Sequence, residues 1–454
     1  MKLLNQIFSL FKWLLPGMGV KRWILSLAVG LLLFSVGLML LTANKTALFL
    51  ELSIQNLFQD NFGLNISSTF IDIFMLITGM LVMCWSACRV FTVIYKTKQP
   101  HDDRALVDLM YERRQLSHGL KIVAVGGGTG LSTLLRGLKR HTSNITAIVS
   151  VSDDGGSSGR LSKELGILPP GDLRNCMTAL ADDENLLNEL FRYRFKKDGS
   201  GLGGHSFGNL FLAALTEMYH NDFEEALRKG SQILNIRGRV LPATLTPTTL
   251  CAKMLDGRLI KGESEIPEAH GQITDVFLEP CHCTPPEEVF KVIAEADCIV
   301  LGPGSLYTSV IPPLLIDGIA DAIKKSKAPK IYVCNVMTQP GETDKYSAAD
   351  HLQAIYHHVG GRIVDYIVVN LAPPNKLRQK YQKTGAHPIK ADLARLRSMQ
   401  VTPVSANLVN EEAVVRHDPV YLAETIIDIT AAHRSKSGEF TLLHSQSSEF
   451  KAVN

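Results

Sequence analysis

Two long apolar runs stand near the start of the chain, ahead of any alternation of short strands and helices. Residues 23–42 carry no charge over about 20 positions, the length that crosses the hydrocarbon core of a bilayer as a helix. Residues 70–94 form the second run, with Asp72 near its start and Arg89 near its end. Its charge-free centre is short for a span, and tilt together with snorkelling of Arg89 makes up the difference. The pattern predicts a transmembrane hairpin over residues 23–94.

The charges that flank the two runs are asymmetric. The loop between the runs carries Lys45 against Glu51 and Asp60. Basic residues precede the first run and follow the second: Lys2, Lys12, Lys21 and Arg22, then Lys96, Lys98, Arg104, Arg113 and Arg114. The positive-inside rule therefore places the protein in the cytoplasmic membrane, with both termini and the main domain in the cytoplasm. The alternatives are a signal peptide for the first run and a buried core helix for the second. No A-x-A-like cleavage site follows the first run, and a second apolar run does.

The hairpin divides the chain into segments of different composition. Residues 1–22 are predicted to be a cytoplasmic N-terminal segment, and the polar residues 95–118 a linker. Residues 119–434 are predicted to be the main domain. Residues 435–454 are rich in Ser, which predicts a disordered tail.

Beyond the linker, short β-branched runs alternate with amphipathic stretches. Predicted strands cover residues 121–125, 145–151, 298–301, 330–335 and 363–370. Predicted helices lie between them, over residues 131–140, 185–195, 209–219, 287–296, 318–325 and 348–358. This alternation predicts an α/β fold with a mostly parallel sheet and helices on both faces. In such folds ligands bind at the carboxyl ends of the strands.

The first predicted strand ends in a glycine-rich loop that includes Gly127, Gly128, Thr129 and Gly130. Such a loop lets the backbone approach a phosphate, and the following helix N-terminus favours negative charge. The alternative is a tight turn without a ligand. The loop lacks the third glycine of a dinucleotide fingerprint and the Lys-Ser/Thr pair of a Walker A loop. Phosphate or nucleotide binding is the favoured interpretation.

Asp153 and Asp154 end the second predicted strand. Paired carboxylates at this place can hold a hard cation such as Mg²⁺, or ribose hydroxyls, whereas a solvated Asp-Gly turn is the alternative. Further along, Arg174 is a predicted ligand-binding residue. Asp172, two residues before it, either belongs to the same site or caps the N-terminus of the helix that follows.

A second polar cluster opens the predicted helix that begins near residue 209. His205 and Asn209 stand in a Gly-rich segment, where His205 could act as a general base. After a later strand, Gly304 and Ser305 belong to a second anion cradle, and Thr338 lies in a further polar segment that follows another strand. Two cradles fit a diphosphate better than a single phosphate.

Composition narrows the ligand classes. A formal net charge of only +3 gives no case for nucleic-acid binding. The 8 cysteines form no paired framework, which suits a reducing compartment.

Six motifs taken together resemble a known family. GGGTGL, SDDGGSSGRL, PGDLRN, GHSFGNL, LGPGSLYTS and NVMTQPGET, in this order, are similar to those of the YvcK-like gluconeogenesis factors, relatives of the CofD-type 2-phospho-L-lactate transferases. The resemblance implies a Rossmann-like CofD fold and binding of UDP-sugars such as UDP-N-acetylglucosamine. It also implies a role in cell shape and envelope growth on gluconeogenic carbon sources. By the same resemblance, Tyr381 and Arg416 contribute to UDP-sugar binding, as a ring that can stack on uracil and a cation that can pair with phosphate.

Three function hypotheses follow. The first is a UDP-sugar-binding regulator without turnover, with no certain cofactor, which forms a homo-oligomer and has a protein partner in envelope synthesis. The second is a CofD-like transferase of a phospho-containing group. There Asp153 and Asp154 hold Mg²⁺, and His205 or Asp172 assists proton transfer. The third, NAD(P)-dependent redox chemistry, is disfavoured by the incomplete fingerprint.

Overall fold

The computed structural model describes residues 21–41, 68–97, 114–182, 185–196, 201–370, 377, 381, 385–411 and 415–436. It divides into two compact units, Met1–Gln115 and Leu116–Asn454, which we treat separately. Residues 1–20, 98–113 and 437–454 lie outside the described residues, and with them most of the predicted N-terminal segment, linker and tail.

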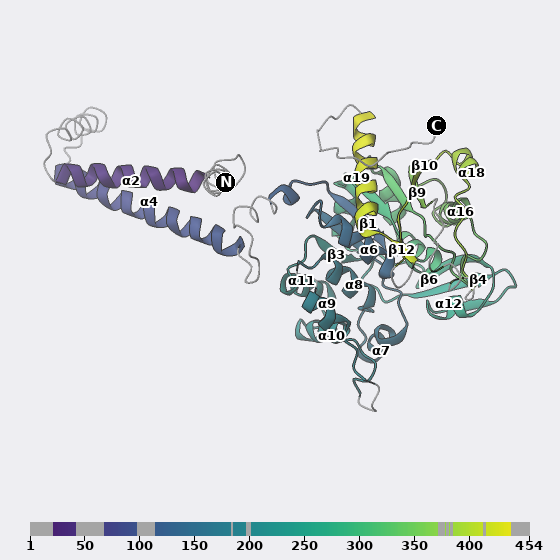
Figure 1. Ribbon diagram of the computed structural model, residues 1–454. Helices are drawn as coiled ribbons and strands as arrows, with labels where there is room; N and C mark the ends of the chain where they lie inside the picture. Colours follow the sequence, from purple (N-terminus) through teal and green to yellow (C-terminus); the bar gives the residue numbers. More distant parts are fainter. Residues whose placement is uncertain are drawn as a thin grey trace. The chain divides into compact units, whose positions relative to one another are not determined.

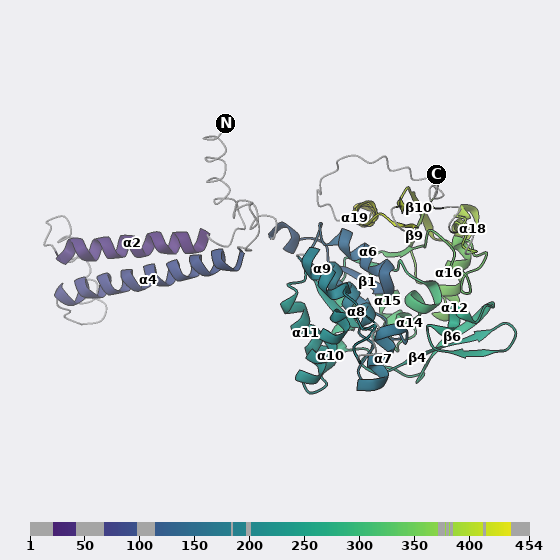
Figure 2. The same ribbon diagram turned by 60° about the horizontal axis from the view of Figure 1, so that its bottom comes forward.

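The first unit contains two apolar helices that pack side by side, α2 (Lys21–Leu41) and α4 (Ser68–Thr97) (Figures 1 and 2). Segments of 20 and 24 residues within them are long and apolar enough to cross a membrane. Glycines allow the close approach: a Cβ atom on Gly79 would lie 2.5 Å from the Phe34 nitrogen, and one on Gly37 2.8 Å from the Leu76 nitrogen. Small residues at such contacts are typical of helix pairs in membranes.

The second unit is built on a seven-stranded sheet in the order β10-β9-β8-β7-β1-β2-β3. Every neighbouring pair is parallel. The strands are β1 (Ile122–Gly126), β2 (Ile145–Val149), β3 (Arg239–Pro242), β7 (Cys298–Leu301), β8 (Lys330–Val333), β9 (Tyr366–Asn370) and β10 (Thr402–Ala406). The chain builds outward from β1 to β3, returns to the other side of β1 with β7, and then proceeds to β10. The order of strands therefore reverses between β1 and β7.

Helices cover both faces of this sheet, as the burial of the interior strand β1 shows. All five residues of β1 are buried, as expected for a parallel strand with both faces covered. Ile122 and Ala124 face one hydrophobic core, while Val123 and Val125 face the other. The first core includes residues of α6 (Gly128–Leu138), α8 (Gly171–Leu180), α11 (Phe223–Ile233) and α19 (Pro419–Lys436). The second includes residues of α13 (Glu287–Ala294), α14 (Ile311–Leu314), α15 (Ile319–Lys325), α16 (Ala348–His358) and α18 (Leu393–Ser398).

Two smaller sheets accompany the main one. The antiparallel sheet β5-β4-β6 consists of β4 (Thr249–Met254), β5 (Leu259–Lys261) and β6 (Ile273–Glu279) (Figure 2). The pair β11 (Val409–Glu411) and β12 (Val415–His417) is also antiparallel. The remaining elements are α7 (Gly156–Leu165), α9 (Asn185–Arg192), α10 (Phe207–Met218), α12 (Glu265–Glu268) and the π-helical turn η1 (Leu306–Val310).

The predicted α/β fold with a mostly parallel sheet is confirmed. All five predicted strands correspond to β1, β2, β7, β8 and β9, and the six predicted helices to α6, α9, α10, α13, α15 and α16. The strands β3 and β10 at the two edges, the antiparallel sheets and α19 were not predicted.

Candidate functional site

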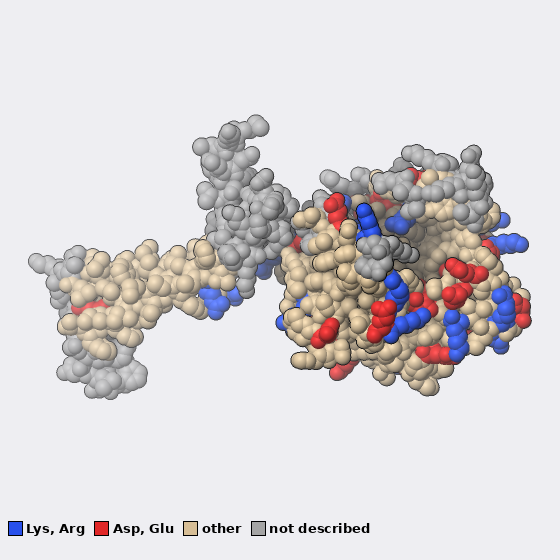
Figure 3. Space-filling view, turned by 90° about the horizontal axis from the view of Figure 1, so that it is seen from below, with Lys and Arg blue, Asp and Glu red and all other residues tan. Residues whose placement is uncertain are grey.

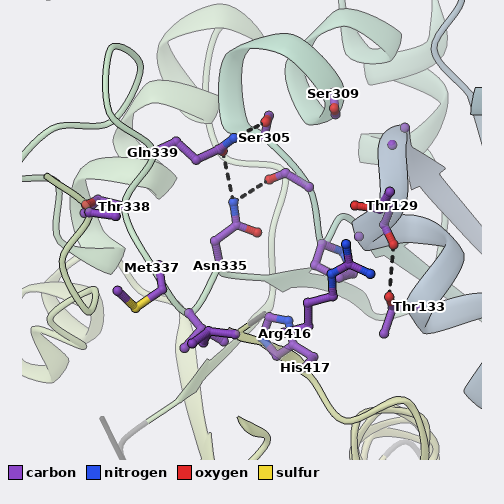
Figure 4. Close-up of a pocket in the computed structure, with 18 of the residues that line it drawn as sticks. Thr129, Thr133, Ser305, Ser309, Asn335, Met337, Thr338, Gln339, Arg416 and His417 are labelled. Carbon is purple, nitrogen blue, oxygen red and sulfur yellow. Dashed lines mark hydrogen bonds between the residues drawn. The ribbon is translucent and has the colours of Figure 1, made fainter. Parts of the chain in front are cut away.

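A cavity of about 530 Å³ lies at the carboxyl ends of the central strands (Figure 4). The loops that follow β1, β7 and β8 line it, together with β12 and Tyr381. The strand order reverses between β1 and β7, and ligands in open α/β sheets bind at such a reversal. Predicted ligand residues that the cavity brings together are Gly127, Gly128, Thr129, Gly130, Gly304, Ser305, Thr338, Tyr381 and Arg416.

The loop after β1 needs its glycines for backbone geometry and for close approach. Gly128 has a φ of 67°, a left-handed conformation that favours glycine. A Cβ atom on Gly130 would lie 2.5 Å from the Pro303 carbonyl oxygen, so these two loops touch backbone to backbone. α6 begins at Gly128, and its first N–H groups and helix dipole favour an anion at this end.

The loop after β7 forms the facing wall. Gly304 and Ser305 precede η1, and the Asn335 side-chain amide donates to the Gly304 carbonyl oxygen at 2.8 Å. Gln339 donates a side-chain hydrogen bond to the Ser305 hydroxyl. Side chains that follow β8 therefore hold the second predicted cradle in place, as Figure 4 shows.

Tyr381 and Arg416 lie at the edge of the cavity formed by β12. The Val415 backbone N–H donates to the Tyr381 hydroxyl at 3.0 Å, which ties the strand to this ring. The Arg416 side chain is exposed and points into the cavity (Figure 4), and within the described part of the chain it forms no ion pair. A guanidinium so placed can pair with a phosphate.

A group of carboxylates lies beside the first glycine loop. The Gly128 N–H donates to Asp172 Oδ2 at 2.6 Å, and a Cβ atom on Gly127 would lie 2.5 Å from the same oxygen. Burial, and then the charge of Asp153, raise the pKa of Asp172 to about 7. Burial, and then Asp172, also raise the pKa of Glu263, which lines the cavity. Proton occupancy of the Asp172 carboxyl therefore changes near neutral pH.

Asp153 and Asp154 do not line the cavity. Asp153 accepts the Gly155 N–H at 3.1 Å, and Asp154 accepts the Ser264 N–H at 2.9 Å. Burial raises the pKa of Asp153. Over the residues that the structure describes, no three His, Cys, Asp or Glu side chains are arranged to hold a metal ion. Mg²⁺ is often held by only one or two carboxylates together with waters and phosphates, so the metal role of this pair stays a prediction.

Arg174, His205 and Asn209 also lie outside the cavity lining, in a buried polar network. The Ser157 hydroxyl is 3.1 Å from His205 Nδ1 and accepts from the Asn209 side-chain amide at 3.1 Å. Arg174 donates to the Phe191 carbonyl oxygen at 3.1 Å. Burial lowers the pKa of His205, which favours a neutral ring. A direct ligand contact by these three residues stays a prediction.

Sequence reasoning missed several residues of the site. The N-cap of α8 is Pro170, so the alternative that Asp172 caps this helix is wrong. Asn335 and Gln339 belong to a motif already recognised, and their position directly after a strand was the available signal. Glu263 had no signal, because it follows the antiparallel strand β5, far in sequence from Asp172. The remaining unpredicted lining residues include Thr133, Ser309 and His417.

Comparison with known proteins identifies the second unit. The family described as 2-phospho-L-lactate transferase CofD matches residues 122–409. A gluconeogenesis factor of Bacillus subtilis is 49% identical over 68% of this chain and 98% of its own length. The crystal structure of a UPF0052-family protein from Bacillus halodurans superposes with a TM-score of 0.65 at 50% identity, and it covers 68% of this chain and 99% of that one.

The N-terminal unit separates two kinds of relatives. A putative gluconeogenesis factor from Nostoc is 45% identical over 95% of this chain and 95% of its own length, so the matching region extends over the helical hairpin. The two Bacillus proteins match 68% of this chain over 98% and 99% of their own length, which agrees with a match to the second unit alone. The chain belongs to the CofD family, and within it to the group whose members are named gluconeogenesis factors.

Proposed function

We propose that the protein binds a UDP-sugar of the UDP-N-acetylglucosamine type in the cavity and acts as a regulatory factor without turnover. The observation that carries the proposal is the convergence of two backbone cradles, at Gly127–Gly130 and Gly304–Ser305, on one cavity with Arg416. Backbone N–H groups at a helix N-terminus and a guanidinium suit a diphosphate. The Tyr381 ring gives a surface on which a uracil can stack. A cavity of about 530 Å³ lies within the range of small-molecule sites.

Binding of UDP-N-acetylglucosamine to residues 116–436 tests the proposal directly. Arg416→Ala should weaken binding about 10- to 100-fold in calorimetry, since a hydrogen bond to a charged group is worth about 1.5–3 kcal/mol. Arg416→Lys should restore part of the affinity. Arg140→Ala, which removes an exposed charge away from the cavity lining, is the matched control. Equal affinity in wild type and Arg416→Ala would reject the assignment of this residue.

A CofD-like transferase remains a second candidate, and Asp172 is the observation that favours it. A carboxyl with a pKa of about 7 beneath the phosphate loop is suited to take a proton from an acceptor hydroxyl. Incubation of the protein with nucleotide-activated donors and Mg²⁺ discriminates the two functions. If the protein consumes the donor, and if Asp172→Asn and Asp153→Asn each abolish this consumption, the transferase is supported. Binding without any product supports the regulator.

We further propose that the hairpin α2–α4 anchors the protein in the cytoplasmic membrane, with the main domain and both termini on the cytoplasmic side. The length and apolarity of the two helices support this location. A membrane-bound UDP-sugar sensor would suit control of cell shape and envelope growth under gluconeogenic conditions, through a homo-oligomer and a protein partner in envelope synthesis. Resistance of the full chain to extraction by alkaline carbonate tests the anchor. Complete release into the soluble fraction would exclude it.

A further inference from the structure

Four side chains form a compact cluster at one end of the hairpin. Arg22 and Trp23 come from α2, and Trp85 and Arg89 from α4. The two indole rings meet edge to face with centroids 4.9 Å apart. The Arg22 guanidinium lies 4.9 Å from the Trp23 centroid, and that of Arg89 lies 5.5 Å from Trp23 and 5.8 Å from Trp85.

This cluster concentrates positive charge on an exposed surface. The residues Arg22, Trp85 and Arg89 are all exposed. Among the described residues neither arginine forms an ion pair with a carboxylate, and Asp72 lies near the opposite end of the hairpin. Figure 3 shows the same polarity: basic surface at one end of the two helices and acidic surface at the other. Two cations around one ring repel each other, so an anion between them would be stabilised.

The stacked geometry also selects the kind of anion. A guanidinium that lies over an indole ring stacks its flat face on the ring. Its N–H groups point outward from the edge of the guanidinium, where they can form hydrogen bonds. Edge N–H groups in a planar fork match the oxygens of a phosphate. Tryptophan rings prefer the level of the headgroups, and arginines near helix ends reach the same level. Leu25, 68% exposed, and Leu81, 62% exposed, give the neighbouring helix surface an apolar character suited to acyl chains.

We propose that Arg22, Trp23, Trp85 and Arg89 form a binding site for the phosphate headgroup of an anionic phospholipid in the cytoplasmic leaflet. The site rests on the membrane location proposed above and is separate from the UDP-sugar cavity. The site binds one lipid through hydrogen bonds from two guanidiniums that the two indole rings hold in place. General electrostatic attraction to an anionic membrane would not need this arrangement.

The full-length chain offers a direct optical test, because only three tryptophans occur in the sequence. In a Trp13→Phe background, both remaining tryptophans belong to the site. The protein is reconstituted in bilayers that contain dibrominated phosphatidylglycerol or dibrominated phosphatidylcholine, and quenching of fluorescence gives the relative affinity of the two lipids at the rings. We expect a preference of about tenfold or more for phosphatidylglycerol, since each arginine at the headgroup level contributes about fivefold, or about 1 kcal/mol.

Variants separate a formed site from general attraction. Arg22→Gln with Arg89→Gln should bring the preference close to one. Arg22→Lys with Arg89→Lys keeps both charges but loses the planar stacked fork, and it should reduce the preference severalfold. Arg140→Gln, an exposed arginine of the second unit, should leave it unchanged.

Several outcomes would overturn the inference. Equal quenching by both lipids in the Trp13→Phe protein, or an unchanged preference in the double lysine variant, would show that no such site exists. Competition by millimolar inorganic phosphate would assign the site to a soluble anion instead. Extraction of the protein by alkaline carbonate would refute the membrane location itself, whereas a retained protein without lipid preference would refute only the lipid site.

Discussion

Asp172→Asn should make the protein more stable at alkaline pH and less stable at acidic pH. The wild-type carboxyl has a pKa of about 7 in the folded protein against 3.8 for its ordinary value. Because the folded state retains the proton that the unfolded state releases, the contribution of Asp172 to stability is highest below about pH 4. It falls as the pH rises to about 7 and is constant above that.

The magnitude follows from the shift. A pKa difference of about 3 between the unfolded and the folded state corresponds to a free-energy difference of about 4 kcal/mol, since each pKa unit is worth about 1.4 kcal/mol. Asp172 is partly exposed, so water screens its charge. The destabilisation that ionisation of Asp172 causes is therefore smaller, about 3 kcal/mol. The asparagine keeps an oxygen for the Gly128 N–H but replaces the other carboxyl oxygen with an amide NH2 group, at a cost of about 1 kcal/mol. The variant should therefore be about 2 kcal/mol more stable at pH 8 and about 1 kcal/mol less stable at pH 4.

Urea denaturation of residues 116–436 at a series of pH values measures this difference. Asp256→Asn is a suitable control, since that carboxylate is exposed and its hydrogen bonds to Arg258 lower its pKa. Its stability difference should show no gain at alkaline pH. A stability difference between Asp172→Asn and wild type that is the same at pH 4 and pH 8 would refute the reasoning, because it would mean that the carboxyl titrates normally in the folded state.

Two further predictions concern close backbone contacts. Gly130→Ala should force the loops after β1 and β7 apart at the Pro303 carbonyl. It should lower the free energy of unfolding by about 1–3 kcal/mol, and with it the melting temperature. It should also lower the affinity for UDP-N-acetylglucosamine. Gly201→Ala, where a Cβ atom meets nothing within 4 Å, should do neither, and equal behaviour of the two variants would contradict the contact. Gly79→Leu should separate α4 from the Phe34 backbone, which protease accessibility of the full chain in detergent can detect. Unchanged accessibility would argue against the packing of the hairpin.

The sequence predicted those parts of the fold and site that depend on local chemistry. Glycines that end buried strands identified Gly127–Gly130 and Gly304, because few other residues permit a close backbone approach after a parallel strand. The long apolar runs identified α2 and α4, which also depends only on local composition.

What the sequence did not predict depends on tertiary arrangement. The edge strands β3 and β10 are short and contain Pro242 and Pro403, which weaken a strand pattern and are tolerated at the edges of a sheet. Glu263 reaches the cavity only because the sheet β5-β4-β6 folds back to it. His205 carries a polar motif that folds into the buried network with Ser157 rather than into the cavity lining.

The position of β1 in the interior of the sheet, between β2 and β7, has a consequence for how the protein acquires its binding capacity. Ile122 pairs with Ile145 on one side, 23 residues later, and with Cys298 on the other, 176 residues later. Closing so long a loop is slow, and during synthesis it must wait until β7 has left the ribosome. Arg416 arrives later still. A nascent or C-terminally truncated chain would thus be unable to bind the ligand. Ligand binding would stabilise only chains that are fully synthesised and folded.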